Sequence, residues 1–329
     1  AVLNDGRIIY GRWEYVDRPA IPSQSLSTIH PDGTQLGVFF GNRVLSPATF
    51  IEPRPVPGTS KILCTLTAHN GPCRGAIGLI DPSLGLNAQA AIVNLTPEVD
   101  IGRVDRGDGN NIHGPYESPY PLDDSLFLAS RGGTIILRDY SGAREVQVIA
   151  PRSGMGFYGV QPVRPRAVPP RLASTLPAAA DTGGAWATVL LDDVYDGLEP
   201  RVKRGEVRQI CVVQEIEKSR FADVKHRAFG FQFPVVSCGA TYAPKKVWGY
   251  APVAEDGSAS FKVPAGVPIY FLALDAEGRA VQRMRSFTHL MPGEVQGCRG
   301  CHGRGGRRPG SGRRGEGERR SRPFAGNLS

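Results

Sequence analysis

The first half of the chain is a series of short apolar runs separated by turn-forming residues. Residues 6–17, GRIIYGRWEYVD, are rich in β-branched and aromatic side chains, and residues 25–42 place two such runs on either side of an Asp32-Gly33 pair. Asp-Gly between two apolar runs is a strong signal for a β-hairpin, and β-branched and aromatic residues favour strands. Because 41 glycines and 28 prolines interrupt the chain, long helices are not expected. The sequence therefore predicts an all-β protein.

Two further stretches, residues 47–83 and 115–150, repeat this organisation. Each begins with a proline-rich strand and continues through apolar runs to an Asp-Pro-Ser or Asp-Tyr-Ser-Gly turn. Groups of three or four strands that recur about every fifty residues are typical of β-propeller blades. Residues 1–160 are thus predicted to form a partial β-propeller of about three blades, with a generic β-meander as the alternative. Since propellers close with more blades and the chain starts at Ala1, we expect further sequence upstream.

The second half contains a linker and a different β-domain. Residues 161–186 hold five prolines and show no periodicity of apolar positions, which indicates a linker. In residues 187–288, short apolar runs return, separated by turns such as Asp256-Gly257. This rhythm is typical of a small β-sandwich. The expected core residues of this domain are Val207, Ile210, Val212, Val247, Phe261, Val263, Ile269, Phe271, Leu272 and Leu274.

Composition and charge restrict the classes of partner. With 329 residues, 40% of them hydrophobic, the chain is long enough for two domains with their own cores, and no membrane span is expected. The net charge is +8, but residues 303–329 hold eight arginines and two glutamates and so carry +6 of it. This Arg/Gly tail has too few apolar residues to fold, so we expect it to be disordered. RNA binding by the tail is the alternative, but no nucleic acid is expected as a partner of the nearly neutral body.

The clearest chemical signal lies in residues 289–302. Cys298 and Cys301 are three positions apart, and His302 follows directly. The string C-x-x-C-H is the attachment signature of c-type haem, in which two thiols form thioethers with one porphyrin and the adjacent imidazole binds the iron. The sequence therefore predicts covalent haem c, with Cys298 and Cys301 as anchors and His302 as the proximal iron ligand. His289 and Met291 are the candidates for the sixth iron ligand.

Two other kinds of site use a C-x-x-C pair. A zinc site would need more ligands nearby, and Cys238 and His289 are the available candidates. A thioredoxin-type redox site would need a βαβ setting, which the strand pattern does not predict. Zinc stays open as the alternative to haem.

Several other polar groups have both an ordinary and a functional interpretation. His69 and His113 each lie near a Gly-Pro turn at the end of a predicted strand, where packing is the ordinary role and ligand binding the alternative. Cys64 and Cys73 could form a disulfide in an oxidising compartment, or stay as buried thiols. The acidic run at residues 98–111 reads as solvated turns, with a calcium loop as the alternative.

Several stretches resemble known families. The residues VKRGEVRQICVVQEIEK (202–218), PVVSCGATY (234–242) and the run from KKVWGY to CRGCH (245–302) are similar to the hydrazine synthase alpha subunit middle domain and its bacterial relatives. In that family, a propeller, a β-rich middle domain and a C-x-x-C-H string follow one another in this order. The N-terminal stretches DGRIIYGRWEYVDR (5–18) and HPDGT (30–34) resemble TolB-like propeller blades of extracytoplasmic bacterial proteins.

The resemblance implies a c-type haem protein for electron transfer or redox catalysis, with an unknown substrate. It further implies a periplasmic or otherwise extracytoplasmic location, and a redox partner protein or other subunits as partners. One feature departs from the family: a tyrosine that would serve as axial ligand shortly after the C-x-x-C-H is missing, because no tyrosine follows Tyr270. Hydrazine formation is therefore not expected. The alternative function is a non-catalytic propeller scaffold or binding protein whose haem site is unfilled.

Overall fold

The structure, a computed structural model, describes residues 1–14, 24–106, 109–177, 185–216, 244–284 and 286–301. Within these segments, the only helices are three short 3₁₀ turns, at Pro82–Leu84, Gln89–Ala91 and Gly109–Asn111. The all-β prediction is therefore confirmed. The chain divides into two compact units, and the main boundary falls between Ser174 and Thr175, inside the predicted linker. No helix of the described segments is long and apolar enough to cross a membrane.

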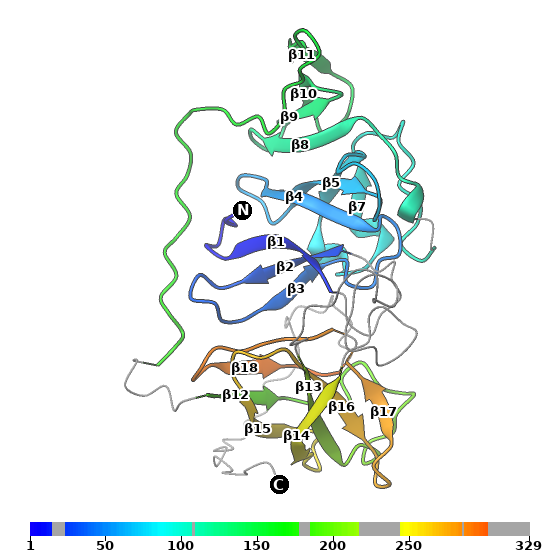
Figure 1. Cartoon of the computed structure of the whole chain (residues 1–329), viewed down its shortest axis with the longest axis vertical. Coiled ribbons are helices and arrows are strands. Elements are labelled where there is room, and N and C mark those ends of the chain that lie inside the picture. The colour runs from blue at the N-terminus through cyan, green and yellow to red at the C-terminus, as the bar shows by residue number, and fades with distance from the viewer. Residues whose placement is uncertain (15–23, 107–108, 178–184, 217–243, 285, 302–329) are drawn as a thin grey trace, which may run out of the picture. The chain divides into compact units, whose positions relative to one another are not determined.

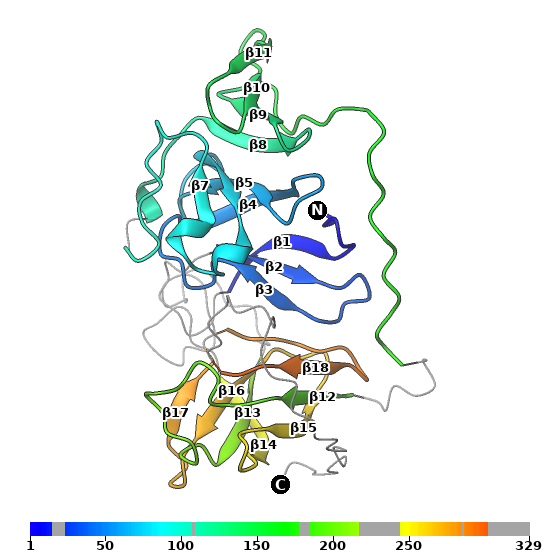
Figure 2. The ribbon, with the colours of Figure 1, turned by 180° about the vertical axis from the view of Figure 1, so that it is seen from behind.

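The first unit consists of consecutive antiparallel strand groups. Strands β1 to β7 form one sheet in the order β1-β2-β4-β5-β6-β7, with β3 paired to β2, and β8 to β11 form a second in the order β11-β10-β9-β8 (Figure 1; Figure 2). The strands are β1 (Ile8–Trp13), β2 (Gln24–Ile29), β3 (Gly37–Phe40), β4 (Thr49–Pro55), β5 (Ile62–Thr67), β6 (Ala76–Ile80), β7 (Ile92–Asn94), β8 (Tyr116–Pro121), β9 (Leu126–Arg131), β10 (Thr134–Asp139) and β11 (Glu145–Ile149).

The strand groups follow the predicted repeat. β2 and β3 pair antiparallel on either side of the Asp32-Gly33 turn, which confirms the expected hairpin. Among the described residues, β2 and β4 are paired only at Gln24 and Thr49, in parallel. The first unit therefore consists of three antiparallel groups, β1–β3, β4–β7 and β8–β11, as expected for successive blades of a partial propeller.

One apolar core runs through all three groups. Every side chain of β5 is buried, because this strand lies inside its sheet and is covered on both faces. The same cluster contains Ile9 and Leu26 from the first group and Phe127 and Ile136 from the third. Each of these large side chains contributes about 1.5–3 kcal/mol by its burial.

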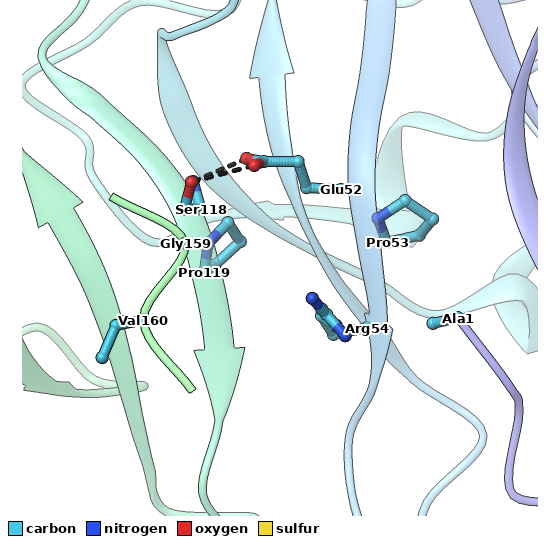
Figure 3. A pocket seen from close by; sticks show the side chains of 8 residues that line it. All are labelled: Ala1, Glu52, Pro53, Arg54, Ser118, Pro119, Gly159 and Val160. Carbon is cyan, nitrogen blue, oxygen red and sulfur yellow. Dashed lines mark hydrogen bonds between the residues drawn. The ribbon is translucent and has the colours of Figure 1, made fainter. Parts of the chain in front are cut away.

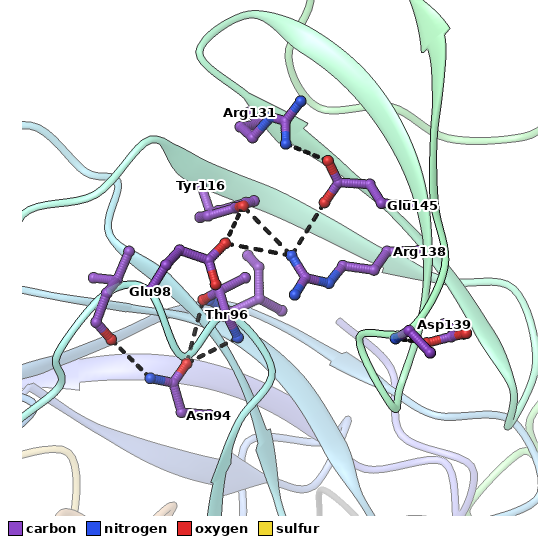
Figure 4. Close-up of polar contacts among 11 residues, drawn as sticks. Asn94, Thr96, Glu98, Tyr116, Arg131, Arg138, Asp139 and Glu145 are labelled. Carbon is purple, nitrogen blue, oxygen red and sulfur yellow. Dashed lines mark hydrogen bonds and ion pairs between the residues drawn. The ribbon is translucent and has the colours of Figure 1, made fainter.

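A buried arginine joins the second group to the third. Arg138 on β10 is only 7% exposed, and its Nη1 lies 3.1 Å from a carboxylate oxygen of Glu145 on β11 and 3.5 Å from one of Glu98, in the loop after β7 (Figure 4). The same nitrogen lies 3.4 Å from the hydroxyl of Tyr116 on β8, and that hydroxyl donates to Glu98. Since a buried charge is stable only when paired, this network fixes the contact between the two groups.

The second unit is a sandwich of two sheets. One sheet has the order β15-β12-β18 and the other the order β14-β13-β16-β17 (Figure 1). Its core combines Val189 and Phe261 of the first sheet with Ile210 and Ala273 of the second, as expected for a β-sandwich. The strands are β12 (Trp186–Leu191), β13 (Gln209–Glu215), β14 (Lys245–Pro252), β15 (Ala259–Pro264), β16 (Ile269–Leu274), β17 (Ala280–Arg283) and β18 (Val295–Cys298).

Most of the predicted core residues of this unit are inside, and one is not. Phe271 is partly buried against the sandwich core, Leu272 is partly buried against a second, smaller cluster that contains Tyr270, and Val247 is 52% exposed. The prediction for Val247 was wrong because the register of β13 and β14 shifts between Val212 and Val213, and the neighbouring Trp248 packs toward the core instead. The predicted residues that are fully buried are Val207, Ile210, Val212, Phe261, Val263, Ile269 and Leu274.

Candidate haem-attachment site

The two cysteines of the C-x-x-C string lie at the end of a short parallel strand pair. β18 runs parallel to β12, with Val295 opposite Thr188 and Cys298 opposite Leu191. Leu191 faces the sandwich core and is 7% exposed. Cys298 and Cys301 are both half-buried and pack against the same core cluster. The thiols therefore lie on an apolar surface at the edge of the core.

Backbone contacts hold the cysteine segment against the turn that follows β12. The N–H of Asp192 donates to the carbonyl of Cys298 at 2.9 Å, and the N–H of Asp193 donates to that of Arg299 at 3.0 Å. Between the cysteines, Gly300 approaches this turn so closely that an added Cβ would lie 2.6 Å from the carbonyl oxygen of Asp196. Only glycine fits there without a shift of the backbone.

The turn is itself braced from the other side by a tyrosine and an arginine. Tyr195 is 1% exposed; its hydroxyl donates to the carbonyl of Val207 and accepts from the N–H groups of Gly205 and Val207, at 3.2, 2.7 and 3.1 Å. Arg204 forms an ion pair with Asp193 at 2.5 Å and lies over the Tyr195 ring, 5.2 Å from its centroid. The cysteines thus rest on a rigid support.

Both thiols are held in the protonated form at neutral pH. Burial raises the pKa of Cys298, and the carboxylate of Asp192 adds to the rise. Burial raises the pKa of Cys301 to about 11, with Cys298 as the smaller cause. Thioredoxin-type and zinc sites need thiolates, which form where positive charge or a metal lowers the pKa. Within the described residues, no group of three or more possible ligands is placed to hold a metal ion.

The structure does not bring His289 or Met291 next to the cysteines. His289 is exposed, and the N–H of Gly293, just beyond Met291, donates to the carbonyl of Trp186 at the start of β12. Cys298 lies opposite Leu191 at the other end of that strand. The five residue steps from Trp186 to Leu191 along β12 span about 16 Å. His302 and Cys238 lie outside the described residues.

The other histidines and cysteines occupy ordinary positions. The ring of His69 packs edge-on against Trp13, with centroids 5.2 Å apart, and His113 is exposed. Cys64 is a fully buried free thiol in β5, as the buried-thiol interpretation expects. Cys73 is also free but exposed, so the structure contains no disulfide between the two.

The acidic run also serves local structure. Asp100 accepts the N–H of Gly102 at 2.9 Å, and Asp105 forms an exposed ion pair with Arg103 at 3.3 Å. Asp108 lies outside the described residues. Asp100 and Asp105 therefore act as turn residues in this structure.

Comparison with known proteins finds a similarity to the family that the sequence resembles. Residues 205–303 match the family model "Hydrazine synthase alpha subunit middle domain", a span that includes the C-x-x-C-H string. This part of the chain is similar to the hydrazine synthase alpha subunit middle domain. Among solved structures, the chain is similar to Kuenenia stuttgartiensis Hydrazine Synthase, with a TM-score of 0.66 and 16% identity over 91% of this chain. No curated protein matches significantly.

At 16% identity, the likeness to the solved hydrazine synthase concerns the fold, and this chain spans 42% of that chain's length. The family match covers the sandwich from β13 onward and ends just after the C-x-x-C-H string.

Sequence reasoning found the cysteines of this hydrazine synthase-like domain but missed their support. Asp193, Tyr195 and Arg204 precede the cysteines by about a hundred residues, and no short motif connects them. The available signal was Gly300, since glycine between two anchor cysteines suggests a close backbone approach. The approaching segment itself is known only from the fold.

Proposed function

We propose that this chain binds a covalent c-type haem through Cys298 and Cys301, with His302 as the proximal iron ligand, and that it serves electron transfer or redox catalysis. The observation that carries the proposal is the pair of half-buried thiols on the sandwich core, three positions apart and followed by a histidine. The hydrazine synthase alpha match over the same residues supports it.

The residues present fit a porphyrin. Thioether formation needs two thiols on one side of the ring, and both thiols here pack on the same apolar cluster. Porphyrins are largely apolar, and each Å² removed from water contributes about 25 cal/mol. Val194 and Leu198, in the turn that supports the cysteine segment, are buried in the interior of this cluster. A bound haem would supply a one-electron redox centre, and Cys298, Cys301 and His302 would hold it.

The proposal includes the setting of the protein. Haem is attached through thioethers outside the bacterial cytoplasm, so we place the chain in the periplasm or another extracytoplasmic compartment. The words "alpha subunit" in the matching family support other subunits or a redox protein as partners. We take the first unit to be a partial TolB-like propeller, for which the three antiparallel groups are the support.

Expression with a cytochrome c maturation system tests the proposal. We expect a haem absorption band and haem staining that stays with the chain in denaturing electrophoresis. The double variant Cys298→Ser/Cys301→Ser should lose the stain, and Cys73→Ser, which removes an exposed cysteine outside the site, should keep it. Colourless wild-type protein would contradict haem binding.

A binding or scaffold role for the first unit is the second candidate function. It is favoured by a pocket between β4 and β8, far along the chain from the cysteines. Colourless protein that retains a ligand in this pocket would favour this role.

A further inference from the structure

Two strands of the first unit carry the same unusual backbone feature at equivalent positions. β4 contains Glu52 followed by Pro-Arg-Pro, and β8 contains Ser118 followed by Pro-Tyr-Pro. Glu52 and Ser118 have φ values of 54° and 53°, in the left-handed region that non-glycine residues avoid. At each position the pairing to the next strand shifts register, as at a β-bulge. β4 and β8 therefore each contain a bulge with the same strained backbone conformation.

The two bulges are locked to each other by the Glu52 carboxylate. It accepts the N–H of Ser118 at 2.6 Å, the hydroxyl of Ser118 at 2.8 Å and the hydroxyl of Thr65 at 3.0 Å. Such strained conformations persist where the surroundings fix them, and they concentrate at binding sites. With three donors already bound, this carboxylate is engaged in holding the strands.

The bulges border a small pocket that contains an arginine with free hydrogen-bonding capacity. Arg54, two residues after Glu52, is half-buried, and its guanidinium lies 5.6 Å from the ring centroid of Tyr120. In the described part of the chain, it has no hydrogen bond and no ion pair. Figure 3 shows its side chain between β4 and β8, while Glu52 turns toward Ser118. The pocket has a volume of about 190 Å³ and is lined by Ala1, Glu52, Pro53, Arg54, Ser118, Pro119, Gly159 and Val160.

We propose that this pocket binds a small oxyanion, of the phosphate or carboxylate class, through the guanidinium of Arg54. The planar guanidinium presents parallel N–H donors that match two oxygens of such an anion. The one carboxylate of the lining, that of Glu52, is held by three donors, and Tyr120 fixes the arginine from one face. The volume corresponds to about six water molecules, enough for a small anion but below the range of drug-sized ligands.

Titration calorimetry with sodium phosphate and with sodium acetate tests this site. The full chain is titrated at constant ionic strength, balanced with sodium chloride, so that general charge screening does not change. We expect saturable binding of at least one of the two anions, at one site per chain. Saturation by phosphate alone or by acetate alone supports the site and identifies the class of anion. The absence of saturable binding by either anion would overturn the proposal.

Substitutions of arginine distinguish anion binding at Arg54 from non-specific attraction by the positive charge of the chain. Arg54→Gln should bind at least about tenfold more weakly, as expected when charge-assisted hydrogen bonds are lost. Arg43→Gln, which removes an exposed arginine elsewhere in the same unit, should bind like the wild type. Arg54→Lys keeps the positive charge but loses the paired N–H donors, so it should bind the anion more weakly than the wild type. This variant provides the test if Arg54→Gln fails to fold. Wild-type affinity in Arg54→Lys and in Arg54→Gln would overturn the proposal.

Discussion

Replacement of Gly300 by alanine tests whether the cysteine segment depends on its contact with the turn after β12. An added Cβ would lie 2.6 Å from both the Cβ and the carbonyl oxygen of Asp196, and 2.9 Å from the carbonyl oxygen of Asp193. Two of these three atoms belong to the backbone, so no side-chain rotation can relieve the clash. The segment must move away from the turn.

The cost follows from the contacts that this movement breaks. The hydrogen bonds from Asp192 to Cys298 and from Asp193 to Arg299 contribute about 0.5–1.5 kcal/mol each. Overpacking of a fitted site costs about 1–3 kcal/mol, and a movement that breaks the hydrogen bonds relieves part of it. We therefore expect Gly300→Ala to lower the free energy of unfolding by about 2 kcal/mol, within a range of roughly 1–3 kcal/mol.

The assay is urea unfolding followed by tryptophan fluorescence. Trp186 and Trp248, two of the three tryptophans, lie in the second unit, so the signal reports mainly on it. Gly297→Ala is the matched control, because the same change three residues earlier meets no atom within 4 Å. Haem staining after expression with a maturation system should fall in Gly300→Ala and stay unchanged in Gly297→Ala. Equal stability and equal staining of the two variants would refute the reasoning.

Three further predictions concern other parts of the structure. Arg138→Ala removes the buried cation beside Glu98 and Glu145, while Glu145 keeps its ion pair with Arg131 and Glu98 its hydrogen bond from Tyr116. It should lower the free energy of unfolding by about 1.5–3 kcal/mol in thermal or urea unfolding, whereas Arg144→Ala, at an exposed position, should change it little. In chain produced without haem, the exposed Cys73 should be alkylated rapidly at pH 7. Burial raises the pKa of Cys301 to about 11, so this thiol should react fast only as the pH approaches that value. Peptide mass spectrometry measures the alkylation of both residues. Tyr195→Phe leaves the buried N–H of Val207 and the more exposed N–H of Gly205 without their acceptor, and it should lower the free energy of unfolding by about 1–3 kcal/mol in the same assay.

Each of these predictions has an outcome that would contradict it. Equal stability of Arg138→Ala and Arg144→Ala would mean that the contacts of Arg138 with Glu98 and Glu145 do not stabilise the first unit. Equal alkylation of Cys73 and Cys301 at pH 7 would mean that the thiol of Cys301 is not protected by burial. If Tyr195→Phe is as stable as the wild type, the hydroxyl of Tyr195 does not stabilise the turn.

The fold was predictable where local pattern decides the structure. The Asp32-Gly33 turn between two apolar runs forms the hairpin of β2 and β3. Alternation placed most of the sandwich core correctly, because each inward side chain follows from the pleat of its own strand. It failed at Val247, where a register shift reverses the side that faces the core. Such a shift depends on the partner strand and leaves no local signal.

The candidate site was predictable in its chemistry but not in its surroundings. Spacing alone predicted Cys298 and Cys301 as candidate anchors, because both come from one short segment. His289 and Met291 are near the cysteines in sequence, but the extended strand β18 separates them in space. The support by Tyr195 and Arg204 depends on a turn about a hundred residues earlier. Contacts at that separation follow from the fold and cannot be read from a motif.

The intact mass of the denatured protein tests the central claim most directly. For chain purified from a host with cytochrome c maturation, we predict the mass of the polypeptide plus one haem, and tryptic peptides that place the haem on Cys298 and Cys301. In the Cys298→Ser/Cys301→Ser variant, the mass should be that of the polypeptide alone. A wild-type mass without any addition would contradict the account.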